Sequence, residues 1–143
     1  MRVVLFAQKP IGERCFQYLV NSSDTFVTLA GACSNEMTEG TWWQSAGIAE
    51  ECSGYDIPFM PSETADNSRT KAFVSECKAD AIISVQHPRL IPQSTLDFVE
   101  GHAFNLHLAP LPEYRGYFGI NHAIINRDLE FRVTIHWMTQ GAD

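Results

Sequence analysis

The sequence predicts an α/β fold in which a mostly parallel sheet carries helices on both faces, and three observations lead to this prediction. Short apolar, β-prone runs alternate with segments of helical spacing along the whole chain. No linker, repeat or low-complexity stretch interrupts them. The chain has 143 residues, 45% hydrophobic and 19% charged, which is typical of one globular domain. Strands separated by helices favour parallel pairing.

The first half of the chain opens with a strand, a turn and a helix. Residues 2–7 form a continuous apolar run, and residues 11–20 follow with Phe16, Leu19 and Val20 at helical spacing. We expect a second strand at 26–33, a weak helix at 42–52, and a short extended piece at 57–60 between prolines.

The second half repeats the alternation. A helix is expected at 67–77, a buried strand at 81–85, a short helix at 94–99, a strand at 103–107, a helix at 120–126 and a strand at 132–138 that alternates sides. The whole is a Rossmann-like arrangement, whose ligands collect outside the carboxyl ends of the strands. The loops after Ala7, Val85, His107 and Met138 are therefore the expected ligand-binding region.

Charge and hydropathy exclude several classes of function. The net charge is -7, and the ten Lys and Arg are scattered, so we expect no nucleic-acid partner. The N-terminal apolar run is too short for a signal peptide or a membrane span, so a cytoplasmic location without membrane contact is expected. The four cysteines form no CxxC pair and are expected to be buried free thiols.

The histidines do not indicate a metal site. His87, His102, His122 and His136 form no HxxxH or HExxH pair, so no metal is expected. His136 alternates along its strand like an ordinary surface or packing residue.

The stretch from Ala103 to Gly116 is the most informative, because a strand there runs into a proline-rich loop. Alternation places Asn105 and His107 on the same face of that strand. An amide can stabilise a developing oxyanion, and an imidazole can move protons near neutral pH. The alternative is that both side chains belong to the core and form their hydrogen bonds with backbone groups. The chemistry alone does not decide between a catalytic and a structural role.

The run from Asn105 to Gly116, NLHLAPLPEYRG, resembles the N-x-H-x-S-x-L-P-x-[YW]-R-G signature of the formyltetrahydrofolate-dependent formyltransferases. The run from Val133 to Asp143, VTIHWMTQGAD, is similar to that family's second signature, which ends near a functional Asp. The resemblance extends weakly over the remaining chain.

The resemblance implies the roles of individual residues. Asn105 would stabilise the tetrahedral intermediate, His107 would carry the proton, and Asp143 would orient His107. The donor, 10-formyltetrahydrofolate, would bind at the segment after the strand 81–85, and the acceptor would bind near the first loop. The expected donor-binding residues are Val85, Gln86, His87, Leu90 and Ile91, and the expected acceptor-binding residues are Gln8, Lys9, Gly12 and Arg89.

The sequence also departs from the family pattern. Ala109 replaces the usual Ser, and Gly119 and His122 stand where many members have a Pro and a larger residue. Members continue past the Asp, so residues 1–143 are expected to be one catalytic domain that is truncated at its C-terminal end. The oligomeric state stays open, with a homodimer as one candidate.

Three amine acceptors are known for such domains, and the sequence favours one. The first loop, AQKPIG, lacks the glycine-rich phosphate cradle expected for the purine-synthesis enzyme, phosphoribosylglycinamide formyltransferase. The acidic charge fits poorly with methionyl-tRNA. A nucleotide-linked amino sugar remains, and residues 101–116 and 131–138 are similar to members of that class, so it is the expected acceptor. Non-enzymatic binding of folate or sugar nucleotides stays open, whereas the missing GxGxxG disfavours a dinucleotide-dependent oxidoreductase.

Overall fold

The computed structural model describes residues 1–23, 25–35, 43, 47–139 and 141. Strands and helices alternate along it as the sequence predicts. Their bounds are β1 Arg2–Ala7, α1 Lys9–Asn21, β2 Thr28–Ser34, α2 Gly47–Gly54, β3 Phe59–Pro61, a 3-10 turn Ser62–Thr64, α3 Asn67–Glu76, β4 Ala81–Val85, α4 Gln93–Phe98, β5 Ala103–His107, α5 Gly119–Asn126 and β6 Thr134–Trp137.

The strands form one six-stranded sheet in the order β3-β2-β1-β4-β5-β6. All neighbours are parallel except β5 and β6, which are antiparallel. The order reverses between β1 and β4, and this switch point is where open α/β sheets bind ligands. The predicted α/β class with a mostly parallel sheet is therefore confirmed.

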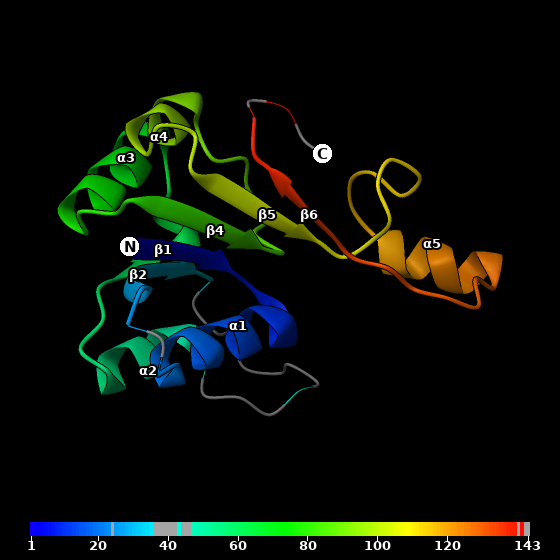
Figure 1. The fold of residues 1–143 in the computed structure, drawn as a ribbon, viewed down its shortest axis with the longest axis horizontal. Coiled ribbons are helices and arrows are strands. Elements are labelled where there is room, and N and C mark those ends of the chain that lie inside the picture. Colours follow the sequence, from blue (N-terminus) through cyan, green and yellow to red (C-terminus); the bar gives the residue numbers. More distant parts are fainter. Residues whose placement is uncertain (24, 36–42, 44–46, 140, 142–143) are drawn as a thin grey trace.

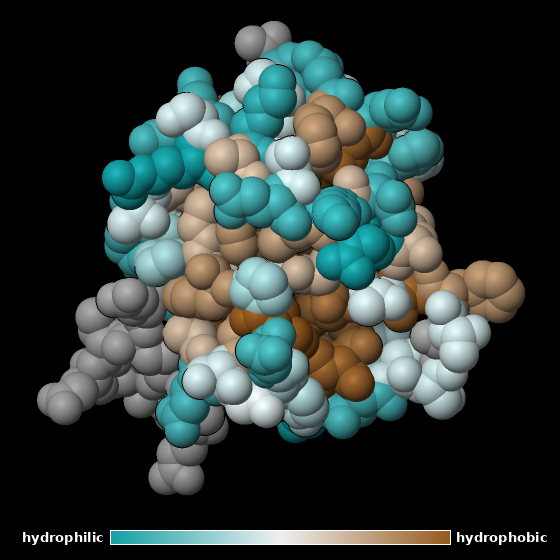
Figure 2. All heavy atoms as spheres, turned by 90° about the vertical axis from the view of Figure 1, so that its left-hand side faces the viewer, coloured by the Kyte–Doolittle hydropathy of each residue, from teal (hydrophilic) through white to brown (hydrophobic). Residues whose placement is uncertain are grey.

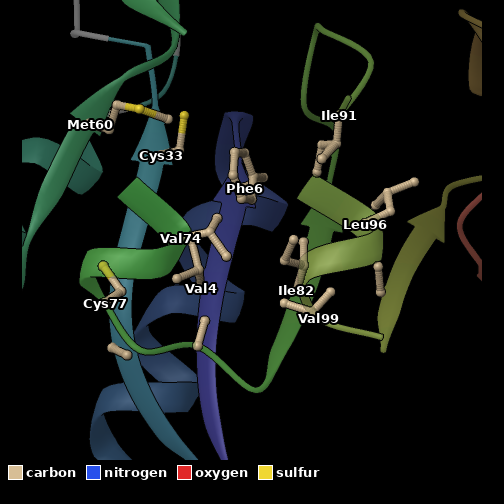
Figure 3. Packing of buried hydrophobic residues seen from close by; sticks show 13 residues of the cluster. Val4, Phe6, Cys33, Met60, Val74, Cys77, Ile82, Ile91, Leu96 and Val99 are labelled. Carbon is tan, nitrogen blue, oxygen red and sulfur yellow. The ribbon is translucent and has the colours of Figure 1, made fainter. Parts of the chain in front are cut away.

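Helices cover both faces of the sheet, with α3 and α4 on one face and α1 and α2 on the other (Figure 1). On the first face, Val74 of α3 and Leu96 of α4 pack with Val4, Phe6 and Ile82 (Figure 3). On the second, Phe16, Ile48 and Cys52 pack against Leu5, Ala7 and Val85. The apolar run of β1 is buried from Val3 onward because it lies between these two layers.

The local sequence explains where two helices and one strand begin. Pro10 stands in the first turn of α1, where its missing N–H costs no hydrogen bond, so the helix begins at Lys9 rather than at residue 11. Asp66 caps α3 by accepting from the amides of Ser68 at 2.9 Å and Arg69 at 2.8 Å. The second strand starts at Thr28 rather than 26, and Phe26 is 80% exposed.

The helix α5 and the loops around it extend beyond the end of the sheet (Figure 1). The opposite end, where β1 starts, carries apolar residues at its centre and hydrophilic ones around them (Figure 2). In the part of the chain that is described, no helix has the length and apolarity needed to cross a membrane.

The four cysteines are free thiols, as predicted. Cys33, Cys52 and Cys77 are buried, and Cys15 is half-buried. Burial raises the pKa of Cys33 and of Cys52 to about 12, so these thiols are protonated and unreactive at neutral pH. Of the two adjacent tryptophans, Trp42 lies outside the described residues, and Trp43 is half-buried and donates to Glu13 at 3.1 Å.

Candidate active site

A cavity of about 740 Å³ opens at the carboxyl ends of β1, β4 and β5. Its wall is built from four chain segments and four single residues: residues 8–11, 86–90, 105–108 and 116–121, with Ser84, His136, Met138 and Gly141. This volume lies within the range of about 300–1,000 Å³ that small-molecule sites occupy. The loops expected to bind ligands therefore surround one site.

Two contacts join the loops that follow β1 and β4. The amide of Gln8 donates to the carbonyl of Val85 at 3.0 Å, and Lys9 Nζ donates to Gln86 Oε1 at 3.2 Å. Both loops contain a residue in the left-handed region, Lys9 at φ 62° and Gln86 at φ 57°. The hydrogen bond from Gln8 to Val85 thus joins the two loops at the point where the strand order reverses, and these loops form one side of the cavity.

Asn105 and His107 occupy alternate positions of β5, and both line the cavity. His107 is buried, with 9% of its surface exposed. Its Nε2 lies 2.8 Å from the carbonyl oxygen of Tyr114. A carbonyl can only accept, so Nε2 carries a proton and, in the neutral ring, Nδ1 carries the lone pair. The contact fixes both the tautomer and the ring orientation of His107.

The chain between β5 and β6 is tied at its base by one hydroxyl. Thr134 Oγ1 donates to the carbonyl of Ala109 at 2.9 Å and accepts from the amide of Leu111 at 3.1 Å. The Leu111–Pro112 peptide bond is cis. These contacts hold the start of the loop next to the end of β5.

The far part of that loop is tied to the C-terminal end of α5. The hydroxyl of Tyr114 donates to Asp128 at 2.6 Å and accepts from Asn126 at 2.8 Å. The departures Ala109 and Gly119 lie against each other, since a Cβ at position 119 would stand 2.7 Å from Ala109 Cβ. Small residues at both positions allow this close approach.

Two exposed aromatic residues stand at the rim of the cavity. Tyr117 donates from its hydroxyl to the carbonyl of Pro88 at 2.8 Å and so bridges the loops after β5 and β4. Phe118 has a left-handed backbone, φ 68°, and is 69% exposed. A bulky residue in this conformation is strained, and such strain gathers at functional sites. Sequence reasoning had assigned no role to either residue.

His87 forms part of the cavity wall in a neutral state. Burial, together with a smaller effect of the nearby Arg89, lowers the pKa of its imidazole to about 4. Its ring meets Phe6 edge-on at 5.2 Å between centroids. Its buried Nδ1 has no hydrogen-bond partner among the described residues. The site therefore presents an uncharged, planar imidazole near Arg89.

Most of the predicted binding residues line the cavity, and three do not. Gln8, Lys9, Gln86, His87, Arg89 and Leu90 line it. Val85 and Ile91 have buried side chains within the two core clusters. Gly12 is buried below the first turn of α1, where a Cβ would lie 2.9 Å from Ala7 Cβ, so it serves helix packing rather than ligand approach. Asp143 lies outside the described residues.

The largest omission of the sequence prediction is His136. It lines the cavity, and its Nε2 lies 3.1 Å from Asn105 Nδ2. The alternation of the last strand places Thr134, His136 and Met138 on one side, but only the antiparallel pairing of β6 with β5 shows that this side faces Asn105. Among the described residues, no group of three or more His, Cys, Asp or Glu side chains could hold a metal ion.

Comparisons with known proteins agree with this architecture. The "Formyl transferase" family model matches residues 22–143. A methionyl-tRNA formyltransferase of Thiobacillus denitrificans is 24% identical over the whole chain, which spans 46% of that relative. The chain thus has about half the length of such relatives.

Two solved structures show the same fold. A phosphoribosylglycinamide formyltransferase from Bacillus halodurans has a TM-score of 0.79 at 22% identity, covering 100% of this chain and 74% of that one. A sugar N-formyltransferase from a Shewanella species has a TM-score of 0.66 at 17% identity, covering 99% of this chain and 52% of that one. With the family model matching most of its length, the chain belongs to the formyl transferase family.

Proposed function

We propose that this chain is a catalytic domain that transfers a formyl group from 10-formyltetrahydrofolate to the amino group of a nucleotide-linked amino sugar. One observation carries the proposal: Asn105 and His107 lie two residues apart on one strand and line the same cavity. This pair provides an oxyanion donor and a proton carrier at one place, which acyl transfer to an amine requires.

The cavity wall suits the donor. Residues 86–90 combine backbone groups with the neutral ring of His87 and the side chain of Leu90. A planar heteroaromatic ring needs apolar faces and a few hydrogen-bonding edges, and this wall offers both. When bound, 10-formyltetrahydrofolate would supply the formyl group, whose carbon is bonded to a nitrogen of the donor as in a reactive amide.

Three residues would then act on the reacting atoms. The acceptor amine forms the new C–N bond, and the amide of Asn105 stabilises the negative charge that develops on the formyl oxygen. His107 takes the proton that the amine loses and returns it to the departing nitrogen of the donor, so no covalent enzyme intermediate is needed. We retain Asp143 as the proposed carboxylate that assists His107.

The acceptor assignment rests on charge and on the first turn of α1. The net charge of -7 disfavours a long polyanion. The first turn makes a poor phosphate cradle, because Pro10 has no N–H and the amide of Gly12 donates to the carbonyl of Gln8 at 3.1 Å. A diphosphate would depend on single cations, and Lys9 and Arg89 both line the cavity.

A direct competition tests the acceptor. The full-length protein, supplied with 10-formyltetrahydrofolate, should formylate a nucleotide-linked amino sugar and ignore glycinamide ribonucleotide. Replacing Lys9 or Arg89 by Met should raise the KM of the sugar nucleotide more than it lowers kcat, since these side chains bind the ground state and the transition state alike. Formylation of glycinamide ribonucleotide at a higher kcat/KM would refute the assignment.

Methionyl-tRNA is the second candidate acceptor, and the relatives favour it. The most similar curated relatives include methionyl-tRNA formyltransferases that match the whole chain. If charged initiator tRNA is formylated faster than any amino sugar, the sugar assignment fails and the roles of Asn105 and His107 remain.

One variant distinguishes an enzyme from a protein that only binds its ligands. His107→Ala in the full-length protein should lower kcat by two orders of magnitude or more and leave the Kd for a stable formyltetrahydrofolate analogue nearly unchanged. Equal losses of binding and turnover would assign His107 a structural role. Lack of turnover in the wild type with all three acceptors would favour the binding module.

A further inference from the structure

His136 takes no part in the chemistry proposed above. In the antiparallel pairing of β5 with β6, His136 stands directly opposite Asn105. Opposite residues on one face of such a pair have neighbouring side chains. The two nitrogens Asn105 Nδ2 and His136 Nε2 lie 3.1 Å apart, and both residues line the cavity.

Two contacts select the tautomer of the His136 ring. The amide nitrogen of Asn105 can only donate, so Nε2 of His136 must accept through its lone pair. On the other side of the ring, Nδ1 lies 3.0 Å from the carbonyl of Trp137, which can only accept, so Nδ1 must carry the proton. Only the neutral Nδ1–H tautomer satisfies both contacts.

This tautomer fixes which way the Asn105 amide points. The last torsion of an Asn side chain is broad and nearly two-fold, so a free amide can exchange its N–H₂ and its oxygen. With His136 as an acceptor, the N–H₂ end faces β6. A flipped amide would set its oxygen against the lone pair of Nε2 and would present oxygen where a donor is needed.

We propose that His136 is a positioning residue that orients the amide of Asn105 as a hydrogen-bond donor toward the formyl oxygen; the proposal rests on the proposed function. His107 stays a separate group, since its ring centroid is 6.5 Å from that of His136. A side chain of the edge strand β6 thereby holds the hydrogen-bond donor on β5 in place. A donor that is oriented before the reaction stabilises the charge that develops in the transition state.

Three substitutions at position 136 in the full-length protein test this role. His136→Leu removes the acceptor, His136→Gln keeps an acceptor oxygen near the place of Nε2, and His136→Asn places one near Nδ1, too far from Asn105. We expect His136→Leu and His136→Asn to lower kcat by roughly 10- to 100-fold, less than the 10²–10³-fold typical of deleting an oxyanion donor. His136→Gln should restore most of kcat, and the KM for 10-formyltetrahydrofolate should change less than about two-fold throughout.

A double-mutant cycle and a neighbouring control complete the kinetic test. In an Asn105→Ala background, His136→Leu should cause almost no further loss, because the residue acts through Asn105. Ile135→Val, on the opposite face of β6 and exposed, should leave kcat unchanged. Additive losses, or equal activity of the Gln and Asn variants, would overturn the proposal.

Nitrogen NMR of the folded protein tests the geometry without any turnover. The His136 ring should show the Nδ1–H tautomer, with coupling through the hydrogen bond to the Asn105 amide, and His136→Leu should shift the Asn105 side-chain signals. An Nε2–H tautomer would overturn the proposal even in an active enzyme. Conversely, an inactive wild type with the expected tautomer would refute the proposed function while the contact itself stood confirmed.

Discussion

Gly12→Ala gives the sharpest test of how the first loop is built, because the sequence and the structure assign this glycine different roles. The sequence suggests that Gly12 lets a ligand approach the backbone. In the structure, a Cβ at position 12 would lie 2.9 Å from Ala7 Cβ and 3.2 Å from the carbonyl carbon of Ala7. Neither atom can rotate away, since Ala7 is fully buried in the central strand.

The size of the effect follows from two opposing contributions. Overpacking a rigid core site costs about 1–3 kcal/mol. Replacing Gly by Ala inside a helix returns up to about 1 kcal/mol. Gly12→Ala should therefore destabilise the protein by up to about 2 kcal/mol, or by up to about 8 °C in Tm for a domain of this size. Gly54 is the matched control, because it ends α2 with nothing within 4 Å of a Cβ, so Gly54→Ala should stabilise by about 0.4–1 kcal/mol.

Urea denaturation of both variants, with the KM of the acceptor measured in parallel, checks this reasoning. The midpoint should fall for Gly12→Ala and rise for Gly54→Ala at an unchanged slope. A Gly12→Ala variant as stable as Gly54→Ala would show that α1 does not press on Ala7. If that variant also had a raised acceptor KM, the role in ligand approach would be restored.

Two further predictions concern the cavity wall. Tyr117→Phe removes the hydrogen bond to the carbonyl of Pro88. In steady-state kinetics, this variant should have a KM for 10-formyltetrahydrofolate that is raised several-fold at nearly constant kcat. A fall in kcat alone would contradict this prediction. His87, whose pKa is about 4 in the fold against an ordinary value near 6.5, should cost stability as the pH falls from about 6.5 to 4, by at most about 3 kcal/mol, because the unfolded chain binds the proton first. His87→Phe should flatten this part of the stability profile measured by denaturant titration, and an unchanged profile would refute the assignment.

Much of the fold could be predicted because its signals are local. The strands β4 and β5 have the predicted bounds, since each is a short apolar run between clear breaks. The helix α1 starts two residues earlier than expected because Pro10 is a good residue for the first turn of a helix. The strand β2 begins later because Phe26 is exposed and Thr28 is the first residue paired with β1.

The sequence alone could place candidate residues next to each other only where they lie on the same strand. Asn105 and His107 share β5, so alternation alone places them together. His136 is 31 residues from Asn105, and neither the antiparallel direction nor the register of β6 can be read from the sequence. The packing of Gly12 against Ala7 could not be predicted for a similar reason, since it depends on how α1 lies on β1.

The hydroxyl of Thr134 has a consequence for how such a domain can diversify. By holding Ala109 and Leu111 at the root of the 110–133 segment, it fixes where the segment leaves the end of β5, and the contact of Tyr114 with His107 ties the middle of the segment to the site. Changes in the part of α5 that lines the cavity can then alter its rim without moving the end of β5. We expect that α5 can be exchanged between relatives to change which acceptor fits, provided that the contacts of Thr134 and Tyr114 with the end of β5 are retained.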